Sequence, residues 1–377
     1  MKILFLTCWY PHKENPGKGI FIKEHANAIK SVGNEIVVIA ISSIKDSALY
    51  KKTVNYFTDE NGVETISIEL RSRFNKLIYA NPLFLYYHLK IEFRKFKPKN
   101  KFDVIHANII APCGLMGYWL SKATGIPLII TEHWSKVGKF MKKNIFSSVA
   151  QSAFRHAKFV TTVSEFLKNN ISEFVIGKEK IKVIPNMVDS EIFCYQPKQK
   201  HNELIFTAVA TWEPPKLPML FVNALNEIQK TNLKKIVLNL IGDGSQLNEI
   251  KQNQNLIQIN YYGRKSKPEI ATMLHQSDFF IHASSIETFS VVIAEALCTG
   301  TPVIASNAGA IPELINEENG LICQNGNAEW ITGINNARER EFNNEKIASD
   351  FSATVNEIEI GKKFTTLYSY ASLINLG

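Results

Sequence analysis

Two glutamates eight residues apart, Glu287 and Glu295, are the acidic residues whose placement most strongly indicates chemistry. Glu295 is the only charged residue in the apolar stretch from Ser290 to Leu297, and the pattern of that stretch predicts a buried helix. A carboxylate inside such a helix is costly unless it is paired or hydrogen-bonded. A structural salt bridge and an acceptor for ligand hydroxyls, such as those of a ribose, both explain it.

Glu287 precedes this helix and follows an expected strand at 279–282. The backbone amides around Phe289 and Ser290 would then be unpaired donors at the start of the helix, which suits an anion or sugar hydroxyls. A glutamate in this position can also serve only as a favourable partner of the helix dipole. The two glutamates do not share one helical face, so they would contact different parts of an extended ligand.

Two further polar residues follow expected strands. His133 comes directly after the apolar run 128–131, and Lys216 comes shortly after the run 204–210. A lone histidine is often structural and a lone lysine usually lies at the surface. Their positions nevertheless make them candidates, His133 for the chemical step and Lys216 for neutralising a diphosphate.

Glycine-rich turns follow two other strands. Gly17 and Gly19 follow the first strand, and Gly242 lies in Ile241–Gly244 after another. Glycines there let backbone amides approach a phosphate or a sugar closely, although a plain tight turn is an equal alternative for Gly242. Neither motif has the third glycine of a dinucleotide fingerprint. The sequence also contains no D-x-D and no cluster with metal-ligand spacing, so we expect no metal.

The elements that position these residues form two series. Short apolar runs alternate with helix-length amphipathic segments, which is typical of an α/β protein with doubly wound parallel sheets. A polar segment at 189–202 separates the series. We therefore expect one domain at 1–190, a second at 196–359, and a last helix at about 360–377 that could pack back on the first. In such sheets, ligands bind beyond the carboxyl ends of the strands.

Composition agrees with a folded two-domain protein. The chain has 377 residues, of which 45% are hydrophobic and 21% charged, and this excludes disorder as the main state. The five cysteines form no C-x-x-C pair, which fits a reducing compartment. The N-terminal apolar stretch is too short for a signal peptide, and no run could span a bilayer. We expect a cytoplasmic protein.

The motifs taken together resemble the nucleotide-sugar site of family 4 retaining glycosyltransferases. Such enzymes have the GT-B fold, in which two Rossmann-like domains face a cleft. The resemblance is specific in the C-terminal half and moderate in the N-terminal half. It rests on these segments in order: the glycines near residue 17, 184–189, 241–244, 262–263, 287–295, 300–305 and 309–313.

The resemblance implies roles for individual residues of the second domain. Glu295 would hold the donor ribose. Glu287, with the amides at Phe289 and Ser290, would hold hydroxyls of the donor sugar, and Lys216 would contact the diphosphate.

Four other positions receive roles in the same way. His133 would lie beside the transferring sugar and, with Glu287, serve catalysis. Gly17 and Gly19 would let backbone amides approach the diphosphate or the acceptor. Gly242 would contribute to donor binding, and backbone near Arg264 would meet the nucleobase.

The implied reaction moves a hexose or related sugar from a nucleoside-diphosphate sugar to a hydroxyl of a glycan or lipid-linked acceptor. The anomeric configuration is retained, and neither a metal nor another cofactor is needed. Two alternatives are a nucleotide-sugar epimerase of related fold and a non-catalytic two-lobe sugar-binding protein, although the latter would carry an export signal.

The chain departs from the family pattern at three positions. Thr211 stands where the family usually has a phosphate-binding arginine, so Lys216 or another cation would carry more of the charge. Ser290 replaces the usual glycine after Phe289, which would narrow the sugar pocket. Met187 replaces a glycine in the motif that joins the domains.

Charge is distributed unevenly along the chain. Residues 1–190 have a net charge of +13 and the remaining residues −5. The segments 90–101 and 136–146 interleave lysines with aromatic or other apolar residues, so they could lie on an anionic membrane at the cytoplasmic face, or simply be solvated basic helices. No recognition motif for nucleic acid accompanies them, and we expect no nucleic-acid partner.

Overall fold

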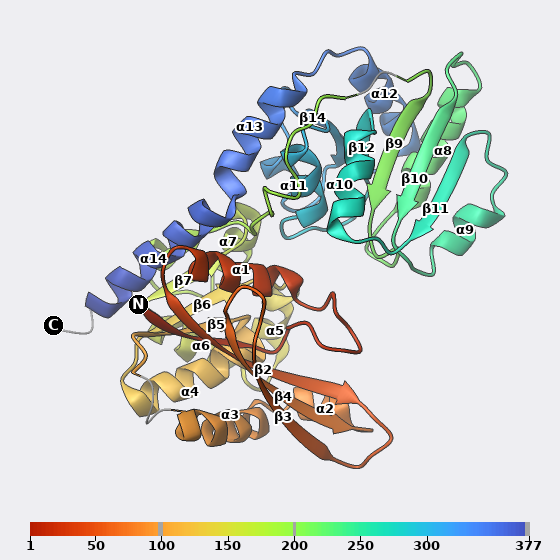
Figure 1. Ribbon diagram of the computed structural model, residues 1–377. Helices are drawn as coiled ribbons and strands as arrows, with labels where there is room; N and C mark the ends of the chain where they lie inside the picture. Colours follow the sequence, from red (N-terminus) through yellow and green to blue (C-terminus); the bar gives the residue numbers. More distant parts are fainter. Residues whose placement is uncertain (97–100, 199–200, 374–377) are drawn as a thin grey trace. The chain divides into compact units, whose positions relative to one another are not determined.

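The computed structural model describes residues 1–96, 101–198 and 201–373, and the chain divides into two compact units (Figure 1). The first unit comprises Met1–Met187 together with Glu357–Gly377, and the second comprises Val188–Asn356. Each unit is a mainly parallel sheet flanked by helices, so the expected α/β fold class is confirmed. Of the basic segment at 90–101, residues 97–100 lie outside the described part of the chain, as do residues 374–377 of the last expected helix.

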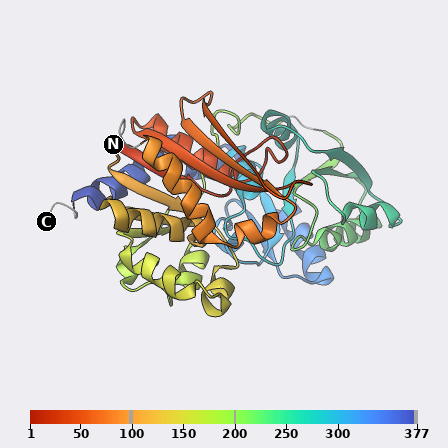
Figure 2. The same cartoon turned by 90° about the horizontal axis from the view of Figure 1, so that it is seen from below.

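The first sheet has eight strands in the order β3-β4-β2-β1-β5-β6-β7-β8. All neighbours are parallel except β3 and β4, which form an antiparallel hairpin at one edge (Figure 2). The strands are β1 (Lys2–Thr7), β2 (Glu35–Lys45), β3 (Lys51–Thr58), β4 (Glu64–Ser72), β5 (Val104–Asn108), β6 (Leu128–Glu132), β7 (Phe159–Thr162) and β8 (Ile181–Val183).

Helices and short helical turns connect these strands. They are α1 (Ile20–Ser31), α2 (Asn75–Tyr79), α3 (Pro82–Phe96), η2 (Ile110–Gly114), α4 (Leu115–Thr124), α5 (Val137–Lys143), α6 (Ser147–His156), α7 (Glu165–Ile171) and η3 (Lys178–Lys180). The central strands β1, β5 and β6 are continuous apolar runs because both of their faces are covered and buried.

The last helix, α14 (Glu357–Leu373), completes the core of the first unit and packs on α1 (Figure 1). The two helices approach closely at Gly361, where an added Cβ would lie 2.0 Å from the carbonyl oxygen of Ala28. Buried Phe364 and Tyr368 of α14 pack against His106 of β5, and the Tyr368 hydroxyl lies 2.6 Å from His106 Nδ1.

The second sheet has six parallel strands in the order β11-β10-β9-β12-β13-β14. Its strands are β9 (Leu204–Val209), β10 (Ile236–Ile241), β11 (Gln258–Gly263), β12 (Phe279–His282), β13 (Val303–Ser306) and β14 (Gly320–Cys323). Its helices and turns are α8 (Pro218–Gln229), α9 (Leu247–Gln252), α10 (Lys267–His275), α11 (Val291–Cys298), η4 (Ile311–Glu313), α12 (Asn327–Arg338) and α13 (Asn344–Val355).

Each sheet has a point at which the strand order reverses. In the first sheet the chain winds outward on one side from β1 and on the other side from β5, and in the second sheet β9 and β12 form the corresponding pair. Adjacent loops diverge at such a point, which leaves room for a ligand beyond the carboxyl ends of the strands. Ligand-binding residues are therefore expected beyond the carboxyl ends of β1 and β5 in the first sheet and of β9 and β12 in the second.

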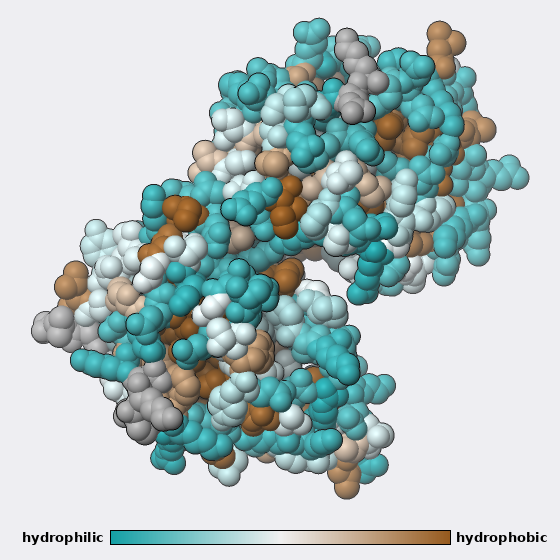
Figure 3. Space-filling view, in the orientation of Figure 1, coloured by the Kyte–Doolittle hydropathy of each residue, from teal (hydrophilic) through white to brown (hydrophobic). Residues whose placement is uncertain are grey.

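The face shown in Figure 3 is mainly hydrophilic, with scattered apolar side chains. Within the described residues, no helix is both long and apolar enough to cross a membrane.

Candidate active site

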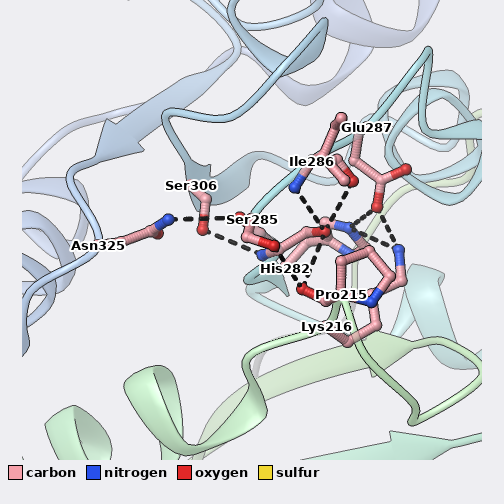
Figure 4. Close-up of polar contacts among 9 residues, drawn as sticks. Pro215, Lys216, His282, Ser285, Ile286, Glu287, Ser306 and Asn325 are labelled. Carbon is pink, nitrogen blue, oxygen red and sulfur yellow. Dashed lines mark hydrogen bonds and ion pairs between the residues drawn. The ribbon is translucent and has the colours of Figure 1, made fainter. Parts of the chain in front are cut away.

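Three side chains meet beyond the carboxyl end of β12 in the second unit (Figure 4). The ammonium of Lys216 contacts Glu287 Oε1, and His282 Nε2 lies 3.0 Å from the same oxygen. Lys216 Nζ and His282 Nε2 are 3.4 Å apart. His282, the last residue of β12, is only 2% exposed, and sequence reasoning did not identify it. A titratable side chain at the carboxyl end of a buried strand is the signal that could have found it.

Backbone contacts hold the loops of this cluster together. Lys216 and Ser284 form an isolated β-bridge, and the Ser285 amide donates to the carbonyl of Pro215 at 3.0 Å. On the other side, the amide of Ala310 donates to the carbonyl of Glu287 at 3.0 Å. Gly309 has a φ of +57°, and an added Cβ there would lie 2.1 Å from the Glu287 carbonyl oxygen, so this turn requires glycine.

The charge state of the cluster follows from its contacts. Burial raises the pKa of Glu287, but the hydrogen bond from His282 and the charge of Lys216 outweigh it and lower the pKa to about 2. Burial and then the charge of Lys216 lower the pKa of His282, although Glu287 opposes them. At neutral pH the Glu287 carboxylate is therefore ionised and the His282 imidazole is neutral.

The chain between the cluster and α11 presents unused polar groups. Within the described residues, the amides of Phe289 and Ser290 donate to no protein acceptor, and the buried hydroxyl of Ser290 has no hydrogen-bond partner. Ser290 has a φ of +71°, a left-handed conformation that serine adopts rarely. Glu295 is 6% exposed and lies on α11, as the sequence predicts.

The remaining donor-binding candidates lie at the carboxyl ends of β10 and β11. Gly242 has a φ of +110°, and an added Cβ would lie 1.8 Å from the carbonyl oxygen of Ala210, so packing alone requires glycine here. Arg264 Nε lies 3.0 Å from Asp243 Oδ2 in an exposed ion pair. Lys216, Gly242, Arg264, Glu287 and Glu295 thus all belong to the second unit.

His133 belongs to the first unit and follows β6. It is 5% exposed, and neither ring nitrogen has a hydrogen-bond partner among the described residues. Its neighbours are the rings of Phe21 and His25, at centroid distances of 4.9 and 5.5 Å. Burial lowers the pKa of His133 well below its usual value, with a smaller contribution from His25, so the imidazole is neutral. A buried imidazole without protein partners is available to a ligand.

Glu132, which sequence reasoning passed over, positions the backbone around His133. One carboxylate oxygen accepts from the amides of His133 and Trp134 at 2.9 and 2.8 Å, and the other accepts from the amide of Ile110 at 3.0 Å. Burial raises the pKa of Glu132 to about 7 against these three hydrogen bonds. The carboxyl group therefore joins the loops that follow β5 and β6.

The two glycines after β1 differ in the structure. Gly19 has a φ of +64°, and an added Cβ would lie 2.3 Å from the carbonyl oxygen of Trp9, so glycine is required. Gly17 is exposed and an added Cβ would approach only Asn15 Oδ1, at 4.0 Å. Steric packing therefore explains why residue 19 is a glycine, but it does not explain the glycine at position 17. In the described part of the chain, no group of three or more acidic, histidine or cysteine side chains could hold a metal ion.

Comparison with known protein families covers nearly the whole chain. The model for glycosyl transferases group 1 matches residues 191–347, and the model for glycosyltransferase family 4 matches residues 17–192. The chain belongs to glycosyltransferase family 4. It is a retaining glycosyltransferase that uses a nucleotide sugar, as the motifs predicted, and the epimerase and binding-protein alternatives are not favoured.

Similar curated proteins are also glycosyltransferases. An uncharacterized glycosyltransferase of Methanocaldococcus jannaschii is 29% identical over 72% of this family 4 chain and 73% of its own length. A putative teichuronic acid biosynthesis glycosyltransferase of Bacillus subtilis is 21% identical over 98% and 97%. The match to an Escherichia coli galactosyltransferase that acts on GlcNAc-diphosphoundecaprenol is 27% identical over 60% of this chain and spans 64% of that enzyme, slightly under two thirds.

Solved structures show that the fold is GT-B. Sucrose-phosphate synthase of Thermosynechococcus elongatus has a TM-score of 0.75 at 16% identity and covers both chains fully. An Anabaena protein solved in complex with UDP has a TM-score of 0.70 at 18% identity, over 98% of this chain and all of that one.

Proposed function

We propose that the second unit of this family 4 glycosyltransferase binds a nucleoside-diphosphate sugar around the Lys216–His282–Glu287 cluster, without a metal. The observation that carries the proposal is that these three side chains meet beyond β12, at the strand pair where the sheet order reverses. In this proposal Lys216 neutralises the diphosphate. The ionised Glu287 and the backbone amides of Phe289 and Ser290 bind hydroxyls of the sugar, and Glu295 binds the ribose.

The proposed transfer needs no covalent nucleophile from the protein. The bond between the anomeric carbon and the diphosphate oxygen breaks, and a bond from that carbon to the acceptor hydroxyl forms on the same face. The hydroxyl proton passes to the departing diphosphate. The negative charge that develops on the leaving group is stabilised by Lys216 and by fixed backbone donors. Since Thr211 supplies no cation, Lys216 carries this task in the second unit.

His133 serves the transfer step in this proposal. Its neutral ring can donate one hydrogen bond and accept another, and neither nitrogen has a partner in the part of the chain that the structure describes. A hydroxyl of the transferred sugar can both accept and donate a hydrogen bond, so it can pair with either nitrogen of the ring. Loss of His133 should therefore slow transfer more than it weakens donor binding.

We propose further that the acceptor is a lipid-linked sugar and that α5 rests on an anionic membrane surface. The similar Escherichia coli enzyme is named for a diphosphoundecaprenol-linked acceptor. Lys136, Lys139 and Lys143 are exposed on or beside α5, and Ile145, which follows Asn144 just beyond the helix, is 87% exposed. Basic and apolar side chains side by side suit an anionic lipid surface.

A panel of nucleotide sugars tests the donor assignment. Wild-type protein should hydrolyse at least one of them slowly and should be stabilised by its nucleoside diphosphate. Lys216→Gln should reduce turnover about 100-fold or more, because it removes a donor to the developing charge. The control is Lys235→Gln, which changes an exposed lysine of the same unit and should have no effect. Equal turnover by the wild type and Lys216→Gln would refute the role of the cluster.

A further inference from the structure

A cavity of about 410 Å³ lies in the first unit, separate from the donor cluster of the second. Its lining comes from the segments that follow β1, β5 and β6, together with the junction of α2 and α3. The pair β1 and β5 is the point where the order of the first sheet reverses. The cavity therefore occupies the position at which this type of sheet binds ligands.

Aromatic side chains form much of the cavity wall. They are Trp9, Tyr79, Trp134, Phe140 and Phe146, and most of the other lining residues are aliphatic or proline. The indole of Trp9 donates to the Tyr79 hydroxyl at 3.0 Å, so these two polar atoms already have partners.

Few polar side chains remain for a ligand. A sugar ring carries several hydroxyls that each need a hydrogen-bond partner when buried, whereas a hydrocarbon chain needs none. The composition of the wall therefore favours a hydrocarbon over a buried sugar ring.

Lys18 supplies a cation to this apolar wall. Its side chain is half-buried and, within the described residues, makes no ion pair or hydrogen bond. Burial lowers the pKa of Lys18, and the buried thiols Cys8 and Cys113 oppose this shift. An ammonium that is partly desolvated and lacks a carboxylate is suited to an anionic group of a ligand.

The rim of the cavity continues into the basic helix. Phe140 of α5, and Asn144 and Phe146 just after it, line the cavity, and the exposed side chains of Lys139, Lys143 and Ile145 alternate with them. One short segment thus contributes apolar wall, positive charge and an exposed aliphatic side chain.

We propose that this cavity binds the hydrocarbon end of a phosphate-bearing lipid acceptor, with Lys18 on the phosphate. The proposal rests on the proposed function and narrows its acceptor to an amphiphile in which a phosphate or diphosphate adjoins a hydrocarbon chain. The aromatic wall contacts the first carbons of that chain. The lysines beside Ile145 face the anionic membrane in which such an acceptor resides.

Equilibrium binding of three small probes tests the proposal on the full-length protein. Farnesyl diphosphate contains both parts of the expected ligand, inorganic diphosphate lacks the chain, and farnesol lacks the charge. Calorimetric titration below the critical micelle concentration should show that farnesyl diphosphate binds at least tenfold more tightly than either partial probe, since each part contributes separately.

Two variants and two matched controls localise the binding. Lys18→Gln should weaken binding of farnesyl diphosphate about tenfold and leave the weak binding of farnesol unchanged, because only the charged contact is lost. Phe140→Ala should weaken both probes several-fold. The controls are Lys13→Gln and Leu83→Ala, which alter exposed residues outside the cavity and should bind as the wild type does. Phe146→Ala replaces Phe140→Ala if the latter does not fold.

The results that would contradict the cavity proposal differ from those that would contradict the donor assignment. If inorganic diphosphate binds as tightly as farnesyl diphosphate, or if neither cavity variant changes binding, the ligand occupies an anion site elsewhere, such as the donor site, and the proposal is overturned. Wild-type protein that binds nucleotide sugars but not farnesyl diphosphate overturns this proposal and leaves the donor assignment standing. If the protein binds farnesyl diphosphate as expected but neither hydrolyses a nucleotide sugar nor is stabilised by a nucleoside diphosphate, the donor assignment is refuted instead.

Discussion

A single carboxylate oxygen determines the electrostatics of the donor cluster. Glu287 Oε1 meets both Lys216 and His282, so the carboxylate is ionised although it is largely buried. The contact with His282 keeps the imidazole in place, while burial and Lys216 keep it neutral. Because His282 is neutral, Lys216 is the side chain of this cluster whose positive charge can contact a diphosphate.

The stabilising effect of Glu287 should depend on pH. Its pKa is about 2 in the folded protein and 4.5 ordinarily, so its stabilisation is complete above pH 4.5 and declines as pH falls toward 2. Glu287→Gln should therefore lower the melting temperature at pH 7, and the difference from the wild type should shrink by pH 3. Thermal unfolding across this range measures it, with exposed Glu227→Gln as control. A difference that does not change with pH would contradict the prediction.

Ser290 should lower the free energy of unfolding of the protein. A serine at a φ of +71°, with a buried hydroxyl that has no partner among residues 1–96, 101–198 and 201–373, combines two unfavourable features. Ser290→Gly should therefore stabilise the protein by about 1 kcal/mol, measured by urea unfolding. Ser290→Ala, which keeps the backbone strain, should gain less. A destabilised glycine variant would show that the hydroxyl makes a contact in the protein that outweighs the strain.

The sequence indicated some residues of the site better than others. Glu295 stands out because charge is rare in apolar segments, whereas Glu287 and Lys216 stand out because each follows an expected strand. His282 and Glu132 end apolar strands and resemble ordinary strand termini in the sequence. Their significance depends on partners such as Lys216 and Ile110, which are distant in the chain and become neighbours only when adjacent strands align.

At the scale of elements, Glu132 joins the segments after β5 and β6. Glu132→Ala would leave two buried amides and the partly buried amide of Trp134 without their acceptor, and each unsatisfied buried group costs ~1–3 kcal/mol. We expect a loss of about 3 kcal/mol or more in the free energy of unfolding, and a smaller loss for Glu132→Gln, which keeps one acceptor. Urea unfolding measures both. A loss below 1 kcal/mol for the alanine variant would mean that water readily replaces the carboxylate.

The contact between α1 and α14 depends on a single small residue. In Gly361→Ala the new methyl group would overlap the carbonyl of Ala28, so the helices must separate, at a cost of about 1–3 kcal/mol. Hydrogen exchange should accelerate along α14, whereas Thr366→Ala on the exposed face should exchange as the wild type does. Unchanged protection in the glycine variant would argue against close helix packing.

Elements with continuous apolar sequence were predictable, and those without it were not. The buried strands β6, β9 and β12 correspond to the expected runs at 128–131, 204–210 and 279–282, because burial on both faces leaves little choice of residue type. The hairpin of β3 and β4 was not expected, since β3 is an exposed edge strand with a largely polar sequence. The short edge strand β14 was also missed.

At the scale of the whole molecule, positive charge gathers in the first half of the chain. If α5 rests on lipid, the double variant Lys139→Gln/Lys143→Gln should reduce co-sedimentation with anionic vesicles about 30-fold, at ~1 kcal/mol per lysine. Lys235→Gln/Lys251→Gln in the second unit is the control for net charge. Equal binding by both double variants, or equal binding to neutral vesicles, would remove the membrane proposal.

The fold was more predictable than the site at this scale, because two series of alternating elements require two α/β sheets whatever their ligand. The acceptor cavity was not predictable, since its walls come from the loops after three strands and from the junction of α2 and α3.

The hydrogen bond between His106 and Tyr368 joins residues 262 positions apart in the chain. During synthesis on the ribosome, every strand of the first sheet emerges long before the helix that seals it. The second unit is translated in between and is a continuous stretch, so it can finish folding first. Until α14 has emerged, the nascent first unit lacks Phe364, whose ring packs on both His25 and His106 in the folded protein.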